Sequence, residues 1–357
     1  MKNLTLSKLR ASKSAAILFY TALIIIITIY RETVTVSCIQ AVNLCLNLII
    51  PTLFPIQVLM YMILNTGLPH SLKSKIHRIT VKLFGLSGNC AEGILLGMIG
   101  GYNAAIKNAV AAYNKRLISR AEAKHISMYF SNPGISFCIM IFGFTIYKSA
   151  AVGLFVFTAS NLISLITAFI NRPKNIYPPS LNESTEANLS FSDAFISAVN
   201  NAGKTVISVS LWILVFAVIK ASVKSIFPFE GFLKLFDIFS DISTGLFVAA
   251  ESYSLPFCVF ALVSGGICIH LQQTEDIRYL EMNSMKFLIS KLINAFATSA
   301  VTWIALKMNL FNTAINTLSY SIKPISGTPL SSLSLVLLVA VFFSLASEYK
   351  KYSYQIN

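Results

Sequence analysis

Charged residues are scarce in this chain of 357 residues. Only 12% of its residues are Asp, Glu, Lys or Arg, whereas soluble globular domains carry about 25%. The run from Thr33 to Leu72 contains no charged residue at all. A soluble domain cannot solvate so long an uncharged apolar stretch, and one membrane span needs only about 20 apolar residues. The sequence therefore predicts an all-α, polytopic integral membrane protein.

Acidic residues are rarer still, with 14 Asp and Glu against 28 Lys and Arg, and the formal net charge is +14. In a soluble protein this excess would indicate nucleic-acid binding. Here the basic residues gather in short segments beside apolar runs, at 73–82 and 115–124, as the positive-inside rule predicts. We therefore expect the lipid bilayer as a partner and no nucleic acid.

Motifs for catalysis and metal binding are also missing. The sequence has no HExxH, no GxSxG and no His/Cys cluster at metal-ligand spacing. Its six cysteines form no Cys-x-x-Cys pair and are expected to be buried thiols. A phosphate-loop-like segment at 198–205 follows no strand and runs into an apolar span, so we reject nucleotide binding there. We predict that the protein is not an enzyme and holds no metal or cofactor.

Long apolar windows predict about eight membrane spans. The first resembles a signal peptide but lacks a small-x-small cleavage site, so we expect it to remain as an anchor. The second contains Pro51 and Pro55 near its centre and is expected to be broken or re-entrant. The expected spans are 14–30, 38–66, 125–147, 149–171, 205–223, 252–274, 287–306 and 324–347.

The chain divides into two similar halves joined by a polar segment rich in Pro, Asn and Ser. Short words recur in the same order in both halves: 39–43 and 196–200, 88–93 and 240–245, 131–135 and 264–267. We expect an N-terminal transmembrane anchor (1–34), a first repeat (35–170), a polar linker (171–190), a second repeat (191–310) and a C-terminal helix with a basic tail (311–357).

Charge placement indicates that the two repeats have inverted topology. With the N-terminus inside, the basic segments 73–82 and 107–124 and the linker all lie inside, and the segment 91–106 enters and leaves on that side. In the second half 235–251 dips in from outside, and 252–274 returns to the basic residues Arg278, Lys286 and Lys291. Inverted repeats around a site near the membrane midplane are a recurrent transporter architecture.

Several motifs resemble a known family. In chain order they are Ile50–Pro55 (IPTLFP), Gly100–Ala105 (GGYNAA), Leu117–Ala123 (LISRAEA), Ser131–Pro133 (SNP), Asp241–Gly245 (DISTG) and Ser264–Gln272 (SGGICIHLQ). Over about residues 35–310 the chain resembles the sporulation integral membrane proteins of the YlbJ (SpoVV) type. These belong with the nucleoside-recognition or Gate domain proteins, which are similar to concentrative nucleoside transporters.

The resemblance implies a role in spore formation, in the bacterial cell membrane and specifically the outer forespore membrane. It implies transport of a small anionic metabolite, with dipicolinate as the named candidate. Further copies of the chain or other sporulation membrane proteins are the implied protein partners. The chain departs from the family at Gly101–Ala105, where a Gly-Tyr-Pro-x-Gly-Ala turn is usual, and at Asp241, where Glu is expected.

The helix breaks are the best candidates for a substrate site. A half-helix that begins inside a membrane presents free N–H groups and a positive dipole end, which suit a carboxylate. The alternative is that Gly and Ser merely let helices pack closely. The candidate substrate-binding residues are Gly100, Gly101, Tyr102, Asn103, Lys107, Ser131, Asn132, Pro133, Gly134, Asp241, Ser243, Thr244, Gly245, Ser264, Gly265, Gly266, His270 and Gln272.

Ionisable residues beside apolar stretches supply the expected charges, because such residues are costly in a membrane and therefore functional by default. Lys107 could neutralise an anion, Asp241 or Glu251 could take a coupling cation, and His270 with Gln272 could relay a proton or contact substrate. The alternative is that these side chains lie solvated at the membrane edge.

We therefore expect a secondary transporter or permease for a small anionic metabolite. A non-transporting membrane protein that organises partners during spore envelope assembly is the alternative. That alternative leaves the paired helix breaks without a purpose. An enzyme acting on lipid-linked substrates is a more distant third.

Overall fold

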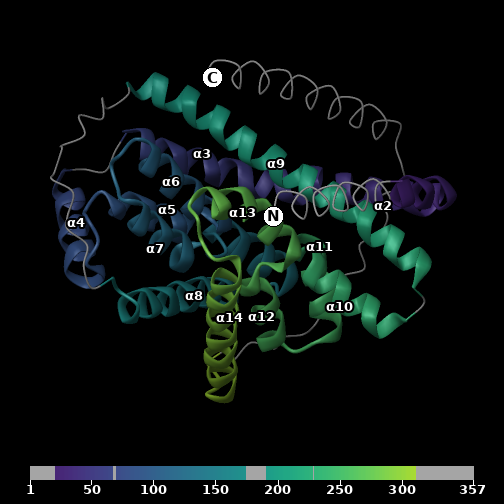
Figure 1. Cartoon of the computed structure of the whole chain (residues 1–357). Coiled ribbons are helices and arrows are strands. Elements are labelled where there is room, and N and C mark those ends of the chain that lie inside the picture. The colour runs from purple at the N-terminus through teal and green to yellow at the C-terminus, as the bar shows by residue number, and fades with distance from the viewer. Residues whose placement is uncertain (1–20, 67–69, 174–189, 228, 311–357) are drawn as a thin grey trace, which may run out of the picture.

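A computed structural model describes residues 21–66, 70–173, 190–227 and 229–310 (Figure 1). The described residues form helices joined by short connections, with no strand among them, so the all-α prediction is confirmed for this part of the chain. The elements are α2 (Arg31–Leu44), η1 (Cys45–Ile49), α3 (Ile50–Thr66), α4 (His70–Phe84), α5 (Cys90–Gly100), α6 (Tyr102–Asn114), α7 (Arg120–Phe130), η2 (Phe137–Ile146), α8 (Ala150–Ile170), α9 (Phe191–Ile226), α10 (Glu230–Ser240), α11 (Ile242–Ser252), α12 (Leu255–Ser264), α13 (Gly266–Tyr279) and α14 (Ser284–Lys307).

Five helical stretches of the described residues are long and apolar enough to cross a membrane: Arg31–Ile63, Ala150–Ile170, Phe191–Ile226, Leu255–Tyr279 and Ser284–Lys307. They coincide with five of the expected spans and indicate a multi-pass membrane protein.

The remaining expected spans have different outcomes. The span 125–147 is divided, because α7 ends at Phe130 and the short apolar helix η2 begins at Phe137. Residues 21–29 of the span 14–30 are helical, and its earlier residues lie outside the described part of the chain. The span 324–347 lies wholly outside it.

The predicted break at Pro51 and Pro55 is wrong, since α2, η1 and α3 follow one another without interruption. A proline ring inside an α-helix normally clashes with the carbonyl four residues earlier. Here a wider π-helical turn, Cys45–Ile49, immediately precedes the prolines. The Thr52 hydroxyl also donates to the Leu48 carbonyl at 2.6 Å, and the helix continues past both prolines.

This helix packs along α9, the longest helix of the described residues, through both α2 and α3 (Figure 1). At 1.5 Å per residue, the 36 residues of α9 span about 54 Å, well beyond the roughly 30 Å of a hydrocarbon core. α9 therefore crosses at a tilt or extends beyond the core.

The basic segment at 73–82, expected to be a loop, is instead part of helix α4. The second basic segment is also mostly helical: α6 continues to Asn114 and α7 begins at Arg120.

The two larger of the three apolar clusters in the core both include residues at the helix breaks. One contains Tyr102 and Leu262 together with residues of η2, α11 and α12. The other contains Ala105, Ile106 and Phe130 and is built mainly from α5, α6 and α7. α6 thus contributes its first residue to one cluster and its next turn to the other.

Two details of the expected organisation need correction. The boundary expected between residues 34 and 35 lies inside α2, so no structural division occurs there. The matched words 88–93 and 240–245 are not equivalent in structure: the first leads into α5, whereas the second forms the turn between α10 and α11. Most of the expected linker 171–190 lies outside the described residues.

Candidate functional site: four converging helix breaks

All four breaks expected from the sequence are present. Gly101 separates α5 from α6, and residues 131–134 separate α7 from η2. Asp241 separates α10 from α11, and Gly265 separates α12 from α13. Gly101 has φ 101° and ψ −179°, a region of backbone conformation that is essentially restricted to glycine.

Two of these breaks are the turns of helical hairpins. Across the turn at Gly101, the Cβ of Ala105 lies against Gly97. Across the turn at Asp241, Gly245 lies against the backbone of Asp237, where an added Cβ would be 2.5 Å from the carbonyl oxygen. Residues 91–106 and 235–251 therefore fold back on themselves, and their entry and exit on one side of the membrane stays a prediction.

The four breaks pack against one another. The Ser131 hydroxyl donates to the Tyr102 carbonyl, which joins the second break to the first. The Tyr102 hydroxyl donates to the Leu262 carbonyl, which brings in the end of α12. Gly266 lies against the Phe239 carbonyl beside the α10–α11 turn. The four breaks therefore lie beside one another in the structure.

Carbonyl groups at the ends of the broken helices have no N–H partner within their own helix. Side chains from other elements donate hydrogen bonds to them instead. Each donor comes from a segment distant in sequence or across the break. The pairs are Gln57 Nε2 with Gly100 O at 3.0 Å, Lys291 Nζ with Ser131 O, and His270 Nε2 with Ser264 O at 3.0 Å.

Two glutamines of α13 complete the contacts at the first break. Gln273 Nε2 donates to the Tyr102 carbonyl at 2.7 Å and to Ser131 Oγ at 2.8 Å. Asn103 Nδ2 donates to Gln272 Oε1 at 2.6 Å. The Asn103 Oδ1 atom is buried and has no hydrogen-bond partner among the described residues.

A buried amide and hydroxyl network fixes the second break to α8 and α14. Asn132 Nδ2 donates to Ser164 Oγ at 2.8 Å, and Asn294 Nδ2 donates to both Asn132 Oδ1 at 2.9 Å and Ser164 Oγ at 2.6 Å. Asn132 Nδ2 also donates to Asn161 Oδ1 at 3.3 Å. Because the network is satisfied and buried, it holds this break in one geometry.

Lys291 brings a cation to the point where the breaks meet. It is 3% exposed, and its Nζ donates to the Ser131 carbonyl and lies 5.4 Å from the centre of the Phe287 ring. Among the described residues no carboxylate lies within ion-pair distance of it. A buried lysine without a carboxylate partner is costly inside a membrane, and such residues mark substrate and ion pathways.

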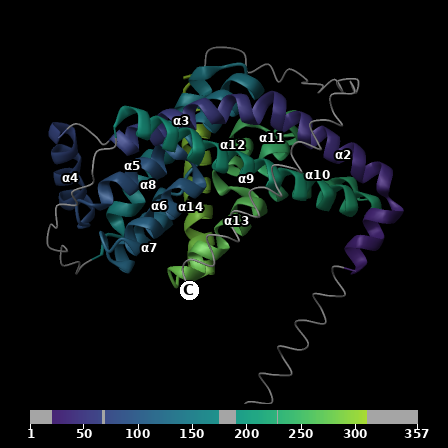
Figure 2. The same ribbon diagram turned by 90° about the horizontal axis from the view of Figure 1, so that it is seen from above.

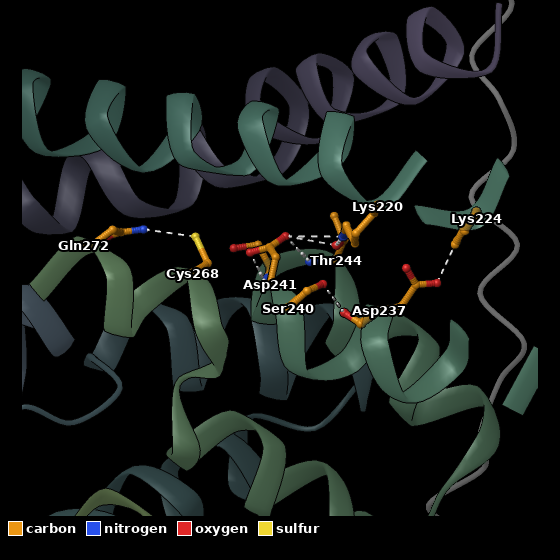
Figure 3. Close-up of polar contacts among 9 residues, drawn as sticks. Lys220, Lys224, Asp237, Ser240, Asp241, Thr244, Cys268 and Gln272 are labelled. Atoms are coloured by element: carbon orange, nitrogen blue, oxygen red, sulfur yellow. Dashed lines mark hydrogen bonds and ion pairs between the residues drawn. The ribbon is translucent and has the colours of Figure 1, made fainter. Parts of the chain in front are cut away.

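The α10–α11 hairpin is joined to α9 by a ladder of two lysine–aspartate pairs (Figure 3). Lys220 Nζ lies 3.7 Å from Asp241 Oδ2 and also donates to Thr244 Oγ1, and both charged side chains are almost fully buried. One helical turn further, Lys224 Nζ lies 2.6 Å from Asp237 Oδ2, with the lysine half exposed.

Asp241 also forms the N-cap of α11. Its two carboxylate oxygens accept from the backbone N–H groups of Ser243 at 3.2 Å and Thr244 at 3.3 Å. Its expected role as a free cation ligand is therefore not supported, because Lys220 and the helix end already neutralise it. By contrast, the N-cap residues of α6 and α13 are Gly101 and Gly265, and no side chain accepts a hydrogen bond from the first backbone N–H groups of either helix.

The structure brings together most residues of the expected site. Gly100 to Asn103, Ser131 to Gly134, Ser264 to Gly266, His270 and Gln272 lie at the breaks, and Asp241 to Gly245 lie at the neighbouring hairpin turn. Lys107 is the exception: it is exposed on α6, close enough to Asp276 of α13 to interact electrostatically. No contact between its side chain and the breaks occurs among the described residues. Glu251 is likewise exposed.

Several residues of the site were not identified from the sequence. Lys291 was counted only among the basic residues that mark the topology, yet it lies buried in α14. A pattern that could have found it is the polar stripe Lys291, Asn294, Thr298 and Thr302 at helical spacing on an otherwise apolar helix. The other residues missed are Gln57, Asn161, Ser164, Lys220 and Gln273.

Among the described residues no three His, Cys, Asp or Glu side chains are grouped so as to hold a metal ion. No family model, curated protein or solved structure matches this chain.

Proposed function

We propose that the protein is a secondary transporter or permease for a small anionic metabolite. The observation on which this rests most is the position of Lys291, a buried lysine that contacts the second helix break and has no carboxylate partner among the described residues. A carboxylate bound there would gain a counter-charge that helix ends alone, at about half a unit each, do not supply.

The surrounding groups suit the same ligand. The uncapped N-termini of α6 and α13 lie at the breaks and offer backbone N–H groups to an anion. A planar dicarboxylate of the dipicolinate class, as the YlbJ-type resemblance implies, would place one carboxylate at Lys291 and the other at a helix end. We propose that Lys291 neutralises the bound anion, the role that was expected of Lys107.

The order of elements supports an inverted-repeat organisation. Each half contains a long helix, a helical hairpin, a broken helix and a closing helix: α3, α5–α6, α7–η2 and α8 in the first, and α9, α10–α11, α12–α13 and α14 in the second. In this alignment Gly101 corresponds to Asp241. We propose that the two halves move relative to one another around the breaks, in the outer forespore membrane of a spore former.

Uptake by proteoliposomes tests the proposal. The purified full-length chain is reconstituted and offered radiolabelled dipicolinate, a nucleoside such as uridine, and a neutral solute of similar size. The expected result is uptake of the dicarboxylate above protein-free vesicles and above the neutral solute. Uptake of uridine alone would move the assignment to nucleosides. Uptake of none would favour the non-transporting organiser of spore envelope assembly.

A further inference from the structure

Helix α4 carries a concentration of positive charge that the transport proposal does not use. Its fifteen residues include Lys73, Lys75, Arg78 and Lys82 and contain no Asp or Glu. Figures 1 and 2 place this helix at the edge of the molecule, away from the helix breaks.

One face of α4 is packed on the protein. Thr80 is 2% exposed and Phe84 is 3% exposed, and both lie on this face. The ring of His77 lies directly over Gly88, where an added Cβ would be 1.6 Å from its Nε2 atom. These contacts fix the rotation of the helix and thereby decide which residues point outward.

The outward side combines a basic stripe with exposed apolar residues. Lys75, Arg78 and Lys82 are exposed and follow one another at spacings of three and four, so they line one stripe opposite the packed face. Ile79 and Leu83, also four apart, form a second exposed stripe beside it, with 52% and 42% of their surfaces accessible.

We propose that α4 lies in the interface of the bilayer and binds anionic phospholipids. Ile79 and Leu83 enter the acyl-chain boundary, and Lys75, Arg78 and Lys82 contact phosphate groups of an anionic leaflet. An amphipathic helix with a basic polar face is typical of this position, and clustered cations beside a span bind anionic lipid through the negative surface potential.

The adjacency of the two stripes favours lipid over an acidic protein surface. A soluble acidic partner would complement the three cations but would leave Ile79 and Leu83 facing water or charge. A leaflet offers phosphates and acyl chains within a few ångströms of one another. The proposal depends on the membrane placement of the chain and not on what it transports.

A fluorescent reporter on α4 tests this in the full-length chain. Cys38 is the only one of the six cysteines that is not buried, so Cys38→Ser gives a background in which Ile79→Cys can be labelled selectively. The labelled protein is reconstituted in phosphatidylcholine with traces of nitroxide-bearing phosphatidylglycerol or nitroxide-bearing phosphatidylcholine. The ratio of the two quenching efficiencies measures local enrichment of the anionic lipid.

The expected ratio is several-fold above one, and the label should be shielded from aqueous iodide. The variant K75Q/R78Q/K82Q should bring the ratio close to one, since each removed charge weakens anionic-lipid association by about fivefold. The matched variant K115Q/R116Q/K124Q, which removes three charges near the α6–α7 turn, should leave it unchanged. A ratio of one in the unmodified chain, an iodide-accessible label, or equal effects of both variants would overturn the proposal.

Discussion

Two buried lysines, Lys220 and Lys291, differ in how their charge is compensated. Lys220 has Asp241 at 3.7 Å and the hydroxyl of Thr244. Lys291 has a backbone carbonyl and an aromatic ring but no carboxylate among the described residues. We infer that Lys220 stabilises the α10–α11 hairpin against α9, whereas Lys291 is available to an anion that arrives from outside.

The Lys220–Asp241 pair can be tested by a double-mutant cycle. Lys220→Met leaves Asp241 buried without its cation and should lower stability by roughly 3–5 kcal/mol. Asp241→Asn keeps an N-cap side chain for α11 but leaves Lys220 unpaired, with a loss of the same order. The double variant should recover much of this loss. Thermal unfolding in detergent measures the stability of the unmodified protein, the two single variants and the double variant. Strictly additive losses would show that the two side chains do not act as a pair.

The sequence alone did not distinguish Lys291 from Lys107. Both are lysines near the end of an apolar run, and a lysine there can snorkel to the surface or turn inward. The decision depends on which face of the helix is packed. In α14 the polar stripe that includes Lys291 faces α8 and the breaks, whereas Lys107 faces outward from α6.

At the scale of elements, close backbone approach shapes both hairpins. In the second hairpin Gly245 of α11 lies so near α10 that an added Cβ would be 2.5 Å from the Asp237 carbonyl and 2.7 Å from the Ile238 Cα. Backbone atoms cannot move aside as a side chain can. The hairpin therefore requires glycine at this position.

Gly245→Ala should consequently destabilise the protein by about 1–3 kcal/mol through overpacking. Gly203→Ala is the matched control, because Gly203 lies within α9 and an added Cβ would meet nothing within 4 Å. The control should be neutral or slightly stabilising, since alanine favours helix over glycine. Thermal unfolding of both variants checks this, and equal melting temperatures would contradict the close approach.

Glu122 at the start of α7 joins two segments through its carboxylate. It is fully buried, and its oxygens accept from the backbone N–H groups of Ser87 at 2.6 Å and Ser119 at 2.7 Å. Burial by itself would raise the pKa of Glu122, but these hydrogen bonds outweigh it and hold the pKa below its ordinary value of 4.5.

Because its pKa is lowered on folding, ionised Glu122 adds to the free energy of unfolding in full above about pH 4.5. This stabilisation is lost as the pH falls through the folded-state pKa. Glu122→Gln should cost about 1–3 kcal/mol at neutral pH, because one N–H group loses its acceptor. The difference in stability between the unmodified protein and this variant should then shrink as the pH is lowered below 4.5. A difference that stays constant across this range would show that the ionised carboxylate is not the stabilising form.

Sequence reasoning located the helix breaks well where glycine and proline act together. Asn132, Pro133 and Gly134 remove both a donor and the helical preference of the chain, and the break follows. Pro51 and Pro55 instead lie in a continuous helix, and the wider π-helical turn directly before them compensates for the space that a proline ring needs. Such compensation depends on local backbone geometry that composition does not report.

At the scale of the whole molecule, the described helices form one body whose polar interior lies where the breaks meet. Tyr102 alone connects three of them, through its carbonyl to Ser131 and Gln273 and through its hydroxyl to Leu262. The lipid-facing surface is apolar, with Phe296 and Trp303 of α14 more than half exposed. Polar groups inside and apolar groups outside are expected of a multi-pass membrane protein.

Dicarboxylate uptake by Lys291→Gln proteoliposomes tests the central claim most directly. The amide can still donate to the Ser131 carbonyl, so the fold is kept while the charge is lost, and the melting temperature in detergent checks this. Uptake should fall at least about 30-fold, as expected when a buried charge partner is removed. Lys115→Gln, in the exposed α6–α7 turn, should transport like the unmodified chain. Undiminished uptake by a folded Lys291→Gln protein would contradict the account. If Lys107→Gln lost uptake instead, Lys107 of α6 would be the residue that neutralises the substrate.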